Sequence, residues 1–491
     1  MSHASTTHAA SAPPRTTSSV IARLATAFVW TLWLASGTVF AAAWYGHEWG
    51  LLGWLRVDGL AAVLWMAITF VSGIVHSYAR RYLVGDHRRY RFFAYGVAFT
   101  LLALLMAAAD HVALFAAAWL GMGLVMARLI GYDRDWTAAR AAGRLAGRYF
   151  LASTACIVIG FGILGWWTGE SSIAGMLTAA PAVPSAVQFV AVGFLLAGAI
   201  VQSAVAPAHR WLATAMTAPT PASALMHAGF VNAGAVLLAR FAPVVTAEPV
   251  LMAAIVLIGG ASAILGQAML QVQPDRKGAL ASSTTAQMGF MLLQCGLGLF
   301  TAAIAHLVLH GCYKTYRFLG VGGAVDRTVP HADARGRSRP LVFATAAATA
   351  IAGTIAFLVI TGKGFGGPPD TGLVLAIVVG LAAFHAVRDL GDRTSRHPIL
   401  GVVLAPVAIV AAIGLYAAVF GAVTAVMADV PGAYAPQELG IVHGVVLVAF
   451  VLAYVAADRG LLGRDPRIYV RLVNAGRPWH PAADGVRGVI R

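Results

Sequence analysis

The sequence predicts an all-α polytopic membrane protein with about fourteen transmembrane helices, and three observations support this fold class. Hydrophobic residues make up 59% of the 491-residue chain, charged residues make up 11%, and the mean hydropathy is +0.78. A soluble globular domain needs more polar surface than this composition supplies. Apolar stretches long enough to cross a bilayer recur along the whole chain. The basic residues between them fall almost entirely on one side of the expected membrane.

The apolar stretches define the expected helices, because about 20 apolar residues span the hydrocarbon core of a bilayer. We expect spans near residues 20–43, 57–79, 92–109, 111–130, 148–168, 185–206, 222–242, 250–273, 278–299, 301–325, 340–361, 372–390, 398–427 and 438–457. Residues 20–457 then form a transmembrane domain. Residues 1–19, rich in Ser, Thr, Ala and Pro, are expected to form a disordered tail, and residues 458–491 a basic cytoplasmic tail. The first apolar run is too long for a cleavable signal peptide.

The placement of basic residues predicts the orientation of the chain. The loops expected on one side hold basic clusters at residues 80–91, 134–144, 276–277, 335–339, 388–396 and 459–491. The loops expected on the other side hold only Arg56, Arg240 and Lys363. Positive charge accumulates on the cytoplasmic side of membrane proteins, so both termini are expected to be cytoplasmic. The net charge of +15 therefore reflects membrane topology and not a nucleic-acid partner.

Two stretches interrupt the helical pattern. The first, APAHRWLATAMTAPTP from Ala206 to Pro221, contains three prolines, so the helix is expected to unwind or kink there. The second, TGKGFGGPPD from Thr361 to Asp370, combines glycines and prolines around Lys363. Interrupted segments in corresponding positions of two halves indicate an inverted-repeat transporter and its site. The second stretch is equally consistent with an ordinary loop.

The stretch from Thr301 to Val325 is apolar overall but carries His306, His310 and Lys314 at spacings of four. On an α-helix these three side chains lie along one face. A lysine at the bilayer centre costs roughly 2.5–3.5 kcal/mol, so such a group usually faces a protein interior or a water-filled cavity. The pattern therefore predicts a proton or ion pathway. The alternative is that Lys314 extends to the membrane interface while the histidines hydrogen-bond to neighbouring helices.

The scarcity of lysine favours a pathway. Only Lys277, Lys314 and Lys363 are lysines among the 34 basic residues. Arginine stays protonated in proteins, whereas a desolvated lysine can release its proton. Asn232 and the hydroxyl cluster Ser282–Thr285 are candidates to supply neutral hydrogen bonds or to hold water along this pathway. Their alternative role is to bond helices to one another.

Five blocks spread between Val57 and Lys363 carry a family resemblance. They are VDGL at 57–60, VSGIVHSYARRYLVGD at 71–86, RFFAY at 91–95, PAHRWLATAMTAPTPASALMHAG at 207–229 and DRKGALASSTTAQMGF at 275–290. These blocks resemble the antiporter-like subunits of respiratory complex I and of cation/proton antiporters, most closely those of the subunit L type. The resemblance implies an antiporter-like transmembrane domain of two inverted five-helix repeats, each with a broken helix.

The same resemblance implies a polar axis of lysines, histidines and a glutamate at mid-membrane. The positions that match this axis are His227, His306, His310, Lys314 and, in the second broken helix, Lys363. Two positions depart from the family: Leu120 replaces the glutamate that follows a tryptophan, and Gln202 replaces the lysine of the first broken helix. A complete pair of half-channels is therefore not expected, and the protonatable groups of the second half predict a single pathway.

These departures, together with HAGFVNAG at His227 to Gly234, resemble the membrane subunit of the DAB-type dissolved inorganic carbon accumulation complex. That resemblance implies an ion-translocating (H⁺ or Na⁺), energy-coupling subunit in the bacterial inner membrane, a transporter subunit and not a stand-alone enzyme. It also implies a large soluble cytoplasmic partner that resembles a zinc-dependent β-carbonic anhydrase. The zinc is expected in the partner, because this chain does not space Cys, His and Asp as a zinc site, and no cofactor is expected here.

Two other functions stay open. One is a proton-pumping subunit of a respiratory NADH dehydrogenase or a multisubunit cation/proton antiporter, against which Leu120 and Gln202 count. The other is a transport-inactive membrane anchor for a soluble enzyme, against which a buried Lys314 would count. The candidate docking surface for a partner is PRIYVRLVNAGRPWHP, from Pro466 to Pro481. Its Tyr, Trp and Arg residues are typical of interfaces, although lipid head groups attract the same arginines.

Overall fold

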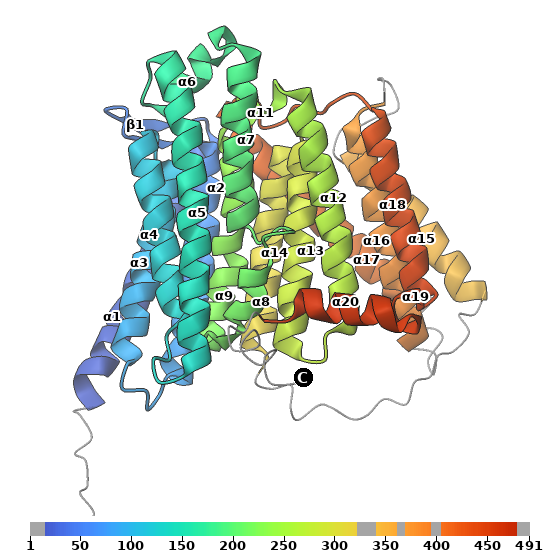
Figure 1. Cartoon of the computed structure of the whole chain (residues 1–491), viewed down its shortest axis with the longest axis horizontal. Coiled ribbons are helices and arrows are strands. Elements are labelled where there is room, and N and C mark those ends of the chain that lie inside the picture. The colour runs from blue at the N-terminus through green and yellow to red at the C-terminus, as the bar shows by residue number, and fades with distance from the viewer. Residues whose placement is uncertain (1–14, 322–339, 361–368, 394–403, 479–491) are drawn as a thin grey trace, which may run out of the picture.

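The computed structural model describes residues 15–321, 340–360, 369–393 and 404–478. Its helices form one bundle with most axes running side by side (Figure 1). The long helices are α1 (Arg15–Trp44), α2 (Gly59–Tyr82), α3 (Arg89–Ala108), α4 (Val112–Ile130), α5 (Thr137–Thr168), α7 (Ser185–Gln202), α12 (Pro249–Val272), α13 (Arg276–Gly296), α14 (Phe300–Leu319), α15 (Pro340–Ile360), α16 (Thr371–Arg393), α17 (Ala405–Val426) and α18 (Ile441–Asp458). The main apolar core is one contiguous cluster that extends from α1 to α18.

Short elements connect or complete the long helices. They are the antiparallel pair β1 (Trp49–Leu51) and β2 (Leu55–Val57), α6 (Ile173–Ala179), η1 (Ala180–Ala182), α8 (Arg210–Thr214), η2 (Ala215–Thr217), α9 (Thr220–Ala228), η3 (Phe230–Asn232), α10 (Ala233–Arg240), α11 (Ala242–Thr246), η6 (Met427–Asp429), α19 (Leu461–Arg464) and α20 (Pro466–Gly476). Of these, α9, η3 and α10 follow one another as a single interrupted span.

The expected fold class, an all-α polytopic membrane protein, is confirmed. In the described ranges, twelve helices are long and apolar enough to cross a membrane. The helices α13 and α14 are not among the twelve, because hydroxyl, amide, histidine and basic side chains interrupt their sequences. Within the described ranges, each of the fourteen expected stretches nevertheless overlaps a helix. The inverted repeats and the exact number of spans stay predictions.

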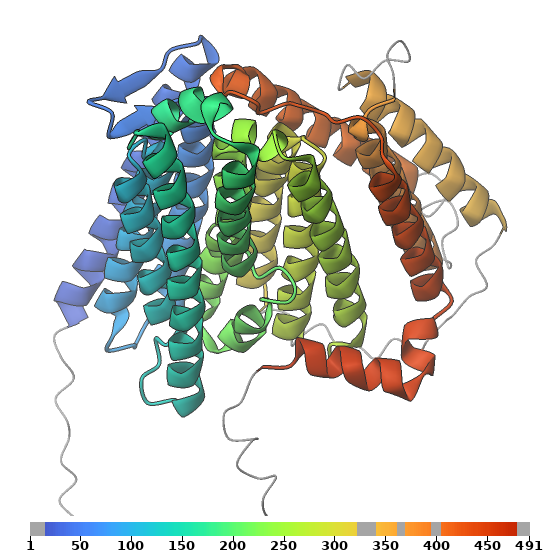
Figure 2. The same cartoon turned by 45° about the horizontal axis from the view of Figure 1, so that its top comes forward.

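The two ends of the described chain lie on the same side of the bundle. Figures 1 and 2 both place the start of α1 and the helix α20 on this side, opposite the β1–β2 hairpin. The loop between α2 and α3, which holds a basic cluster, lies on the side of α20 as well. We call this side of the bundle, where the start of α1, the α2–α3 loop and α20 lie, the arginine-rich side. The described part of α1 starts at Arg15, five residues before the expected span.

The first expected break is present between α7 and α9. The helix α7 ends at Gln202, and the chain passes through α8 and η2 before α9 begins. Backbone groups freed by the break find partners: the Trp211 indole donates to the Val201 carbonyl (2.9 Å), and the Lys277 amine donates to the Ala218 carbonyl (3.0 Å). Irregular backbone inside a membrane protein is stable only if its N–H and C=O groups find hydrogen-bond partners. The second expected break, with Lys363, lies outside the described residues except for its last two positions.

Glycines bring α12 and α13 into close contact. A Cβ atom built on Gly289 of α13 would lie 2.5 Å from the Ala263 nitrogen of α12, and one on Gly259 would lie 2.5 Å from the Leu293 nitrogen. Small residues permit this approach of backbones in membrane bundles. We expect Gly289→Ala to force the two helices apart and to destabilise the protein by about 1–3 kcal/mol, the usual cost of overpacking.

Thermal unfolding of the detergent-solubilised protein measures this effect. The matched control is Gly193→Ala in α7, where an added Cβ meets no atom within 4 Å. The control is expected to change stability by no more than about 0.5 kcal/mol. Equal unfolding temperatures for both variants would show that the α12–α13 contact is looser than described.

Candidate functional site

The polar face of α14 points into the bundle, toward α9 and α13. His310 and Lys314 are buried and His306 is partly buried. The rings of His306 and His310 lie 5.8 Å apart between centroids, with planes at 77°. Gly311 allows the close approach of α9, since a Cβ there would lie 3.0 Å from the Ala228 carbonyl oxygen. The predicted stripe therefore lies in the protein interior.

Lys314 is fully buried inside the bundle, with 0% of its surface exposed, so its amine reaches neither solvent nor the outer surface of the bundle. Its amine donates to the Leu280 carbonyl (3.0 Å) and to the Ser283 hydroxyl (2.5 Å), both on α13. A charged ammonium has three N–H donors, whereas a neutral amine has two and a lone pair. The two oxygens match the donors of a neutral amine, and a third donor can form when the amine takes up a proton.

The Leu280 carbonyl links Lys314 to His227. It accepts hydrogen bonds from the hydroxyls of Ser283 (3.0 Å) and Thr284 (2.8 Å) as well as from the amine of Lys314. The Thr284 hydroxyl also lies 2.9 Å from His227 Nδ1. A hydroxyl has one hydrogen, so when Thr284 donates it to Leu280, the Thr284 oxygen accepts from His227 and the proton of a neutral ring lies on Nδ1. This assignment leaves His227 Nε2 as the basic nitrogen.

Packing holds the His227 ring in place. It stacks on Phe318 of α14, with centroids 4.3 Å apart and planes at 22°. Its Nε2 atom and the Nε2 atom of His310 are buried, and neither has a hydrogen-bond partner among the described protein groups. Buried polar atoms are normally satisfied, often by ordered water. The two nitrogens therefore offer basic sites that face the interior next to the Lys314 network.

Two glutamines of α13 hold His306. Its Nδ1 atom lies 2.9 Å from Gln294 Oε1, and its Nε2 atom lies 2.8 Å from Gln287 Oε1. The Gln294 amide nitrogen in turn donates to the Tyr416 hydroxyl of α17 at 3.4 Å. A protonated His306 ring donates from both nitrogens, so both glutamines can present their oxygens to it. A neutral ring donates from only one nitrogen, so one glutamine must turn its side-chain amide and present its NH₂ to the other nitrogen. The pair can thus accommodate either protonation state of His306.

Gln287, Gln294 and Tyr416 were not among the predicted site residues. The signal for the glutamines is present in the sequence, because residues seven apart lie on one face of a helix and amides are rare within apolar spans. We expect Gln287→Met to leave one His306 nitrogen unpaired and to destabilise the protein by about 1–3 kcal/mol. Gln267→Met, at an exposed position of α12, is the matched control. Indistinguishable thermal unfolding of the two variants would contradict the assigned His306 contacts.

Leu120 and Gln202, the positions at which the resemblance implies a glutamate and a lysine, lie among neutral groups in the first half of the bundle. Gln202 is fully buried, and its amide has no hydrogen-bond partner among the residues described. Trp119 donates to Ser153 (3.2 Å), and Ser153 donates to the Gly198 carbonyl (2.8 Å). Leu120, beside this tryptophan, is partly buried. These contacts bind helices together without a titratable side chain.

The buried carboxylates of the described chain lie at helix ends and not at mid-span. They are Asp58 directly before α2, Asp110 in the short connection between α3 and α4, and Glu248 directly before α12. Over the described ranges no three His, Cys, Asp or Glu side chains are placed to hold a metal ion. Around α14 the interior groups that can exchange protons are thus His227, His306, His310 and Lys314, and two further buried histidines, His76 of α2 and His209 at the first break, lie away from this stripe.

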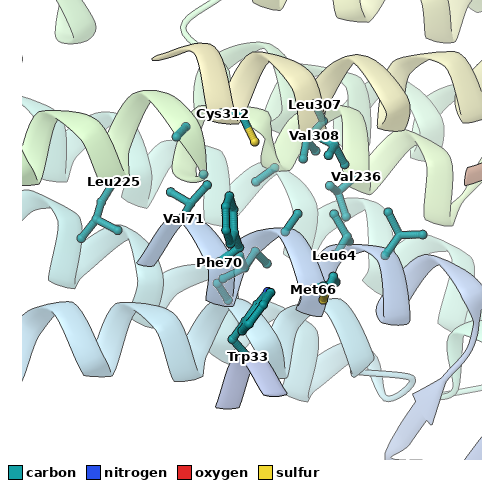
Figure 3. A pocket seen from close by; sticks show the side chains of 18 of the residues that line it. Trp33, Leu64, Met66, Phe70, Val71, Leu225, Val236, Leu307, Val308 and Cys312 are labelled. Atoms are coloured by element: carbon teal, nitrogen blue, oxygen red, sulfur yellow. The ribbon is translucent and has the colours of Figure 1, made fainter. Parts of the chain in front are cut away.

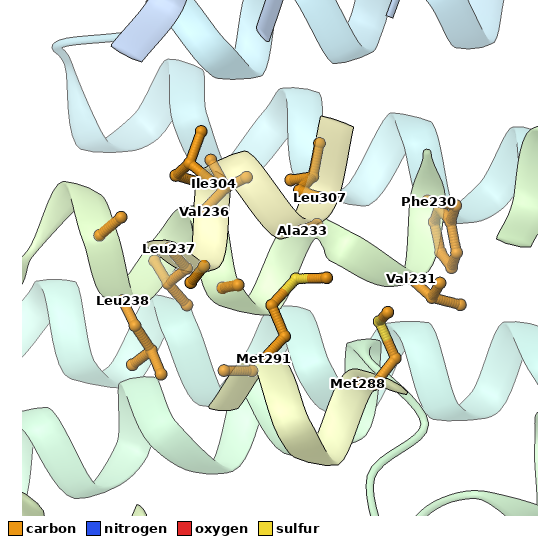
Figure 4. Packing of buried hydrophobic residues seen from close by; sticks show 14 of the residues in the cluster. Phe230, Val231, Ala233, Val236, Leu237, Leu238, Met288, Met291, Ile304 and Leu307 are labelled. Atoms are coloured by element: carbon orange, nitrogen blue, oxygen red, sulfur yellow. The ribbon is translucent and has the colours of Figure 1, made fainter. Parts of the chain in front are cut away.

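An apolar cavity of about 420 Å³ lies on another side of α14 (Figure 3). It is lined by Leu307 and Cys312 of α14, Leu225 of α9, Trp33 of α1 and Phe70 of α2, among others. Figure 4 shows apolar side chains from η3, α10, α13 and α14 gathered in one region of tight packing. The polar network is therefore flanked by apolar surfaces.

Two solved structures share the fold. A chain of the Mrp complex from Dietzia sp. DQ12-45-1b has 22% sequence identity and a TM-score of 0.54, with 94% of this chain and 51% of that chain covered. A chain of the membrane-bound sulfane sulfur reductase, an archaeal respiratory membrane complex, has 16% identity and a TM-score of 0.57, with 96% of both chains covered. At these identities the likeness shows the fold alone.

Curated relatives are more similar in sequence. The "Probable inorganic carbon transporter subunit DabB1" of Halothiobacillus neapolitanus is 34% identical over 306 residues, or 60% of this chain and 54% of that protein. The "NADH-quinone oxidoreductase subunit L" of Mycobacterium tuberculosis is 33% identical over 356 residues, or 71% of this chain and 54% of that protein. The chain thus spans about half the length of these relatives. Both are named as subunits of larger assemblies.

Two family models match the chain. The model described as "NADH-Ubiquinone oxidoreductase (complex I), chain 5 N-terminus" matches residues 54–93. The model described as "NADH:quinone oxidoreductase/Mrp antiporter, TM" matches residues 109–390, which is more than half of the 491-residue chain. The chain therefore belongs to the NADH:quinone oxidoreductase/Mrp antiporter family of transmembrane subunits.

Proposed function

We propose that this chain is the ion-translocating, energy-coupling membrane subunit of an inorganic carbon uptake complex, oriented with both termini in the cytoplasm of a bacterium. The observation that carries the proposal is the buried Lys314 amine, connected through α13 to His227 and lying on one helical face with His306 and His310. A basic group at this depth is costly unless it has a function. The similarity to probable inorganic carbon transporter subunits supports the choice of substrate.

In this proposal the ion is a proton or Na⁺ that crosses by way of the α14 stripe. For a proton, His306 accepts it while the amide of Gln287 or Gln294 turns to match the new state of the ring. The proton then passes by way of His310 to the Lys314 amine. When Lys314 releases that proton, it returns to a neutral amine whose two N–H groups donate to the Leu280 carbonyl and the Ser283 hydroxyl.

The proposed partner is a large cytoplasmic subunit that resembles a zinc-dependent β-carbonic anhydrase, and α20 supports a place for it. This helix lies across the arginine-rich side (Figure 2) and packs through Leu472 on Met269 and Val272 of α12. Its end reaches the first break, where His209 Nε2 lies 3.1 Å from the Ala475 carbonyl. A change at α20 is thereby transmitted to the broken segment and, through the neighbouring α13, to Lys314.

The test of the function is growth of a bacterium that lacks its own carbonic anhydrases. Such a host, given the chain together with its soluble partner, is expected to grow in air, while either protein alone is expected to fail. Accumulation of labelled inorganic carbon should show the same pattern and should disappear with an uncoupler of the ion gradient. Rescue by the soluble partner alone would show that this chain is dispensable and would overturn the proposal.

A second candidate is a pumping subunit of a respiratory complex, favoured by the similarity to subunit L of Mycobacterium tuberculosis over 71% of this chain. The neutral residues Leu120 and Gln202 count against it. Co-purification of the native protein distinguishes the two: NADH-dependent quinone reductase subunits would support the respiratory assignment, and a zinc protein would support inorganic carbon uptake. A membrane anchor without transport is a third candidate, against which the buried Lys314 counts.

The exposed face of α20 gives a sharper prediction about the partner. Ile468, Tyr469 and Val470 have 41–52% of their surface exposed, whereas Leu472 is buried. We expect α20 to stay packed on α12 when these three residues are changed together to Ser, because Leu472 is kept. Binding of the partner should weaken about tenfold or more, because exposed aromatic and aliphatic side chains supply much of the binding energy of interfaces. The matched control is Leu461→Ser on the adjacent α19, a residue with 44% exposure. Retention of the partner by the triple variant would exclude α20 as the docking helix.

A further inference from the structure

A basic pocket lies between the ends of α1, α2 and α3 on the arginine-rich side. It encloses about 550 Å³ and is lined by Arg23 of α1, by Ser77, Tyr78, Arg80 and Arg81 of α2, by Arg89 of α3, and by Ser19 of α1. Four guanidinium groups from three helices thus surround one cavity. We call this site the α1–α3 arginine pocket. It is separate from the α14 network and has no part in the proposed ion pathway.

Contacts within the protein hold one of these arginines in position. Arg89 donates to the Arg80 carbonyl oxygen (2.6 Å) and lies over the Phe93 ring, 5.8 Å from its centroid. Its Nε atom is buried and has no hydrogen-bond partner in the part of the chain that the structure describes. A buried guanidinium N–H normally finds an acceptor. Arg89 therefore lines the pocket and retains one donor without a partner among the described residues.

Nearby carboxylates are engaged elsewhere. Asp86 accepts from the Tyr132 hydroxyl (2.9 Å) and from the Arg88 backbone nitrogen (2.6 Å). Asp135 pairs with the side chain of Arg88, which does not line the pocket. Among the described ion pairs none involves Arg23, Arg80, Arg81 or Arg89. Like charges this close repel one another unless an anion lies between them.

The surroundings favour the head group of a lipid over a free ion. Next to Arg23, Leu24 has 64% of its surface exposed and Phe28 has 43%, so this side of α1 presents an apolar surface suited to acyl chains. The pocket is therefore at the level where head groups begin. Deeper along the same two helices lies the apolar cavity that Trp33 and Phe70 help to line (Figure 3). Arg23 and Trp33 are ten residues apart, or about 15 Å along a helix, which is within the length of an acyl chain.

We propose that the α1–α3 arginine pocket binds the phosphate of an anionic phospholipid from the cytoplasmic leaflet. Guanidinium groups bind phosphate oxygens with paired N–H donors, a geometry that lysine does not provide. Basic pockets between transmembrane helices on the cytoplasmic side are suited to anionic head groups. The bound lipid neutralises the pocket and joins α1, which has few buried residues, to α2 and α3.

Native mass spectrometry of the full-length protein in detergent tests this site, with phosphatidylglycerol and phosphatidylcholine of the same acyl chains as probes. The protein is expected to retain one phosphatidylglycerol selectively. Arg23→Gln is expected to weaken its binding about 5-fold, and the triple change Arg23→Gln, Arg80→Gln and Arg89→Gln about 100-fold, because each arginine near a membrane surface contributes about 1 kcal/mol. The matched control is Arg144→Gln, an exposed arginine of α5 outside the pocket, which should retain binding.

Three results would overturn the proposal. One is equal retention of phosphatidylcholine and phosphatidylglycerol. Another is an equal loss of phosphatidylglycerol in Arg144→Gln and Arg23→Gln, which would indicate general attraction to basic loops. The last is stabilisation of the protein against heat by inorganic phosphate to the same extent as by phosphatidylglycerol, which would identify a free anion as the ligand. The single variant Arg23→Gln decides the matter if the triple variant fails to fold, because no described hydrogen bond involves the Arg23 side chain.

Discussion

Lys314→Met is expected to lower inorganic carbon uptake on the order of 100-fold in cells that contain the complex, because general acid–base groups typically contribute factors of this size. Methionine fills a similar volume but cannot carry a proton. The loss should appear in the rate of uptake and not in the amount of complex in the membrane, which is measured in parallel by co-purification. In this variant the Leu280 carbonyl loses the lysine but still accepts hydrogen bonds from the Ser283 and Thr284 hydroxyls.

Two further variants separate proton transfer from a purely structural role of the charge. Lys314→Arg keeps a positive charge but does not release a proton, so it should also be inactive. Lys277→Arg makes the same exchange at a lysine that donates to the Ala218 carbonyl near the broken segment, and because the donor is kept, it should retain most of the uptake. Full activity of Lys314→Arg would show that the site needs only a fixed charge.

Arg240→Met is expected to destabilise the protein by about 3–5 kcal/mol, the usual effect of leaving a buried charge without its partner. The Arg240 guanidinium pairs with Asp58 through both terminal nitrogens and also donates to the Ala107 carbonyl of α3 (2.7 Å). Asp58 is 2% exposed and caps α2 by accepting from the Ala61 nitrogen (3.0 Å). The pair therefore joins α2, α3 and α10 on the side opposite the arginine-rich side.

Thermal unfolding in detergent measures the loss, and two variants control it. Arg56→Met removes a partner of Glu48 at the surface, where a pair contributes about 0–1 kcal/mol, so stability should hardly change. The double variant Asp58→Asn, Arg240→Met removes both buried charges and keeps a capping side chain at position 58. It should be more stable than Arg240→Met alone. Equal unfolding temperatures for Arg240→Met and Arg56→Met would contradict the buried pair.

The helices and the α14 stripe could be predicted because they depend on local periodicity. A spacing of four places His306, His310 and Lys314 on one face whatever surrounds the helix. The cost of exposing such a face to lipid then predicts that it turns inward, as it does. The proline-rich first break follows from backbone chemistry in the same way.

The partners of these groups could not be predicted, because they depend on how helices rotate against each other. Which face of α13 meets His306 is set by the glycine contacts between α12 and α13 and by Gly311 of α14, and these are properties of the packed bundle. Asp58 belongs to the VDGL block and Arg240 is one of the basic residues expected on the other side, but they are 182 residues apart and their pairing needs the tertiary fold. Lys363 and the second break stay predictions, since they lie outside the described residues.

The most direct test is cation flux through the purified complex in liposomes under an imposed membrane potential. Internal dyes for H⁺ and for Na⁺ are read in parallel, with wild-type and Lys314→Met complexes at equal protein content. The account predicts that one of the two cations enters wild-type vesicles and that Lys314→Met vesicles show only the leak of protein-free liposomes. Equal flux in both preparations would contradict an ion pathway through the buried lysine.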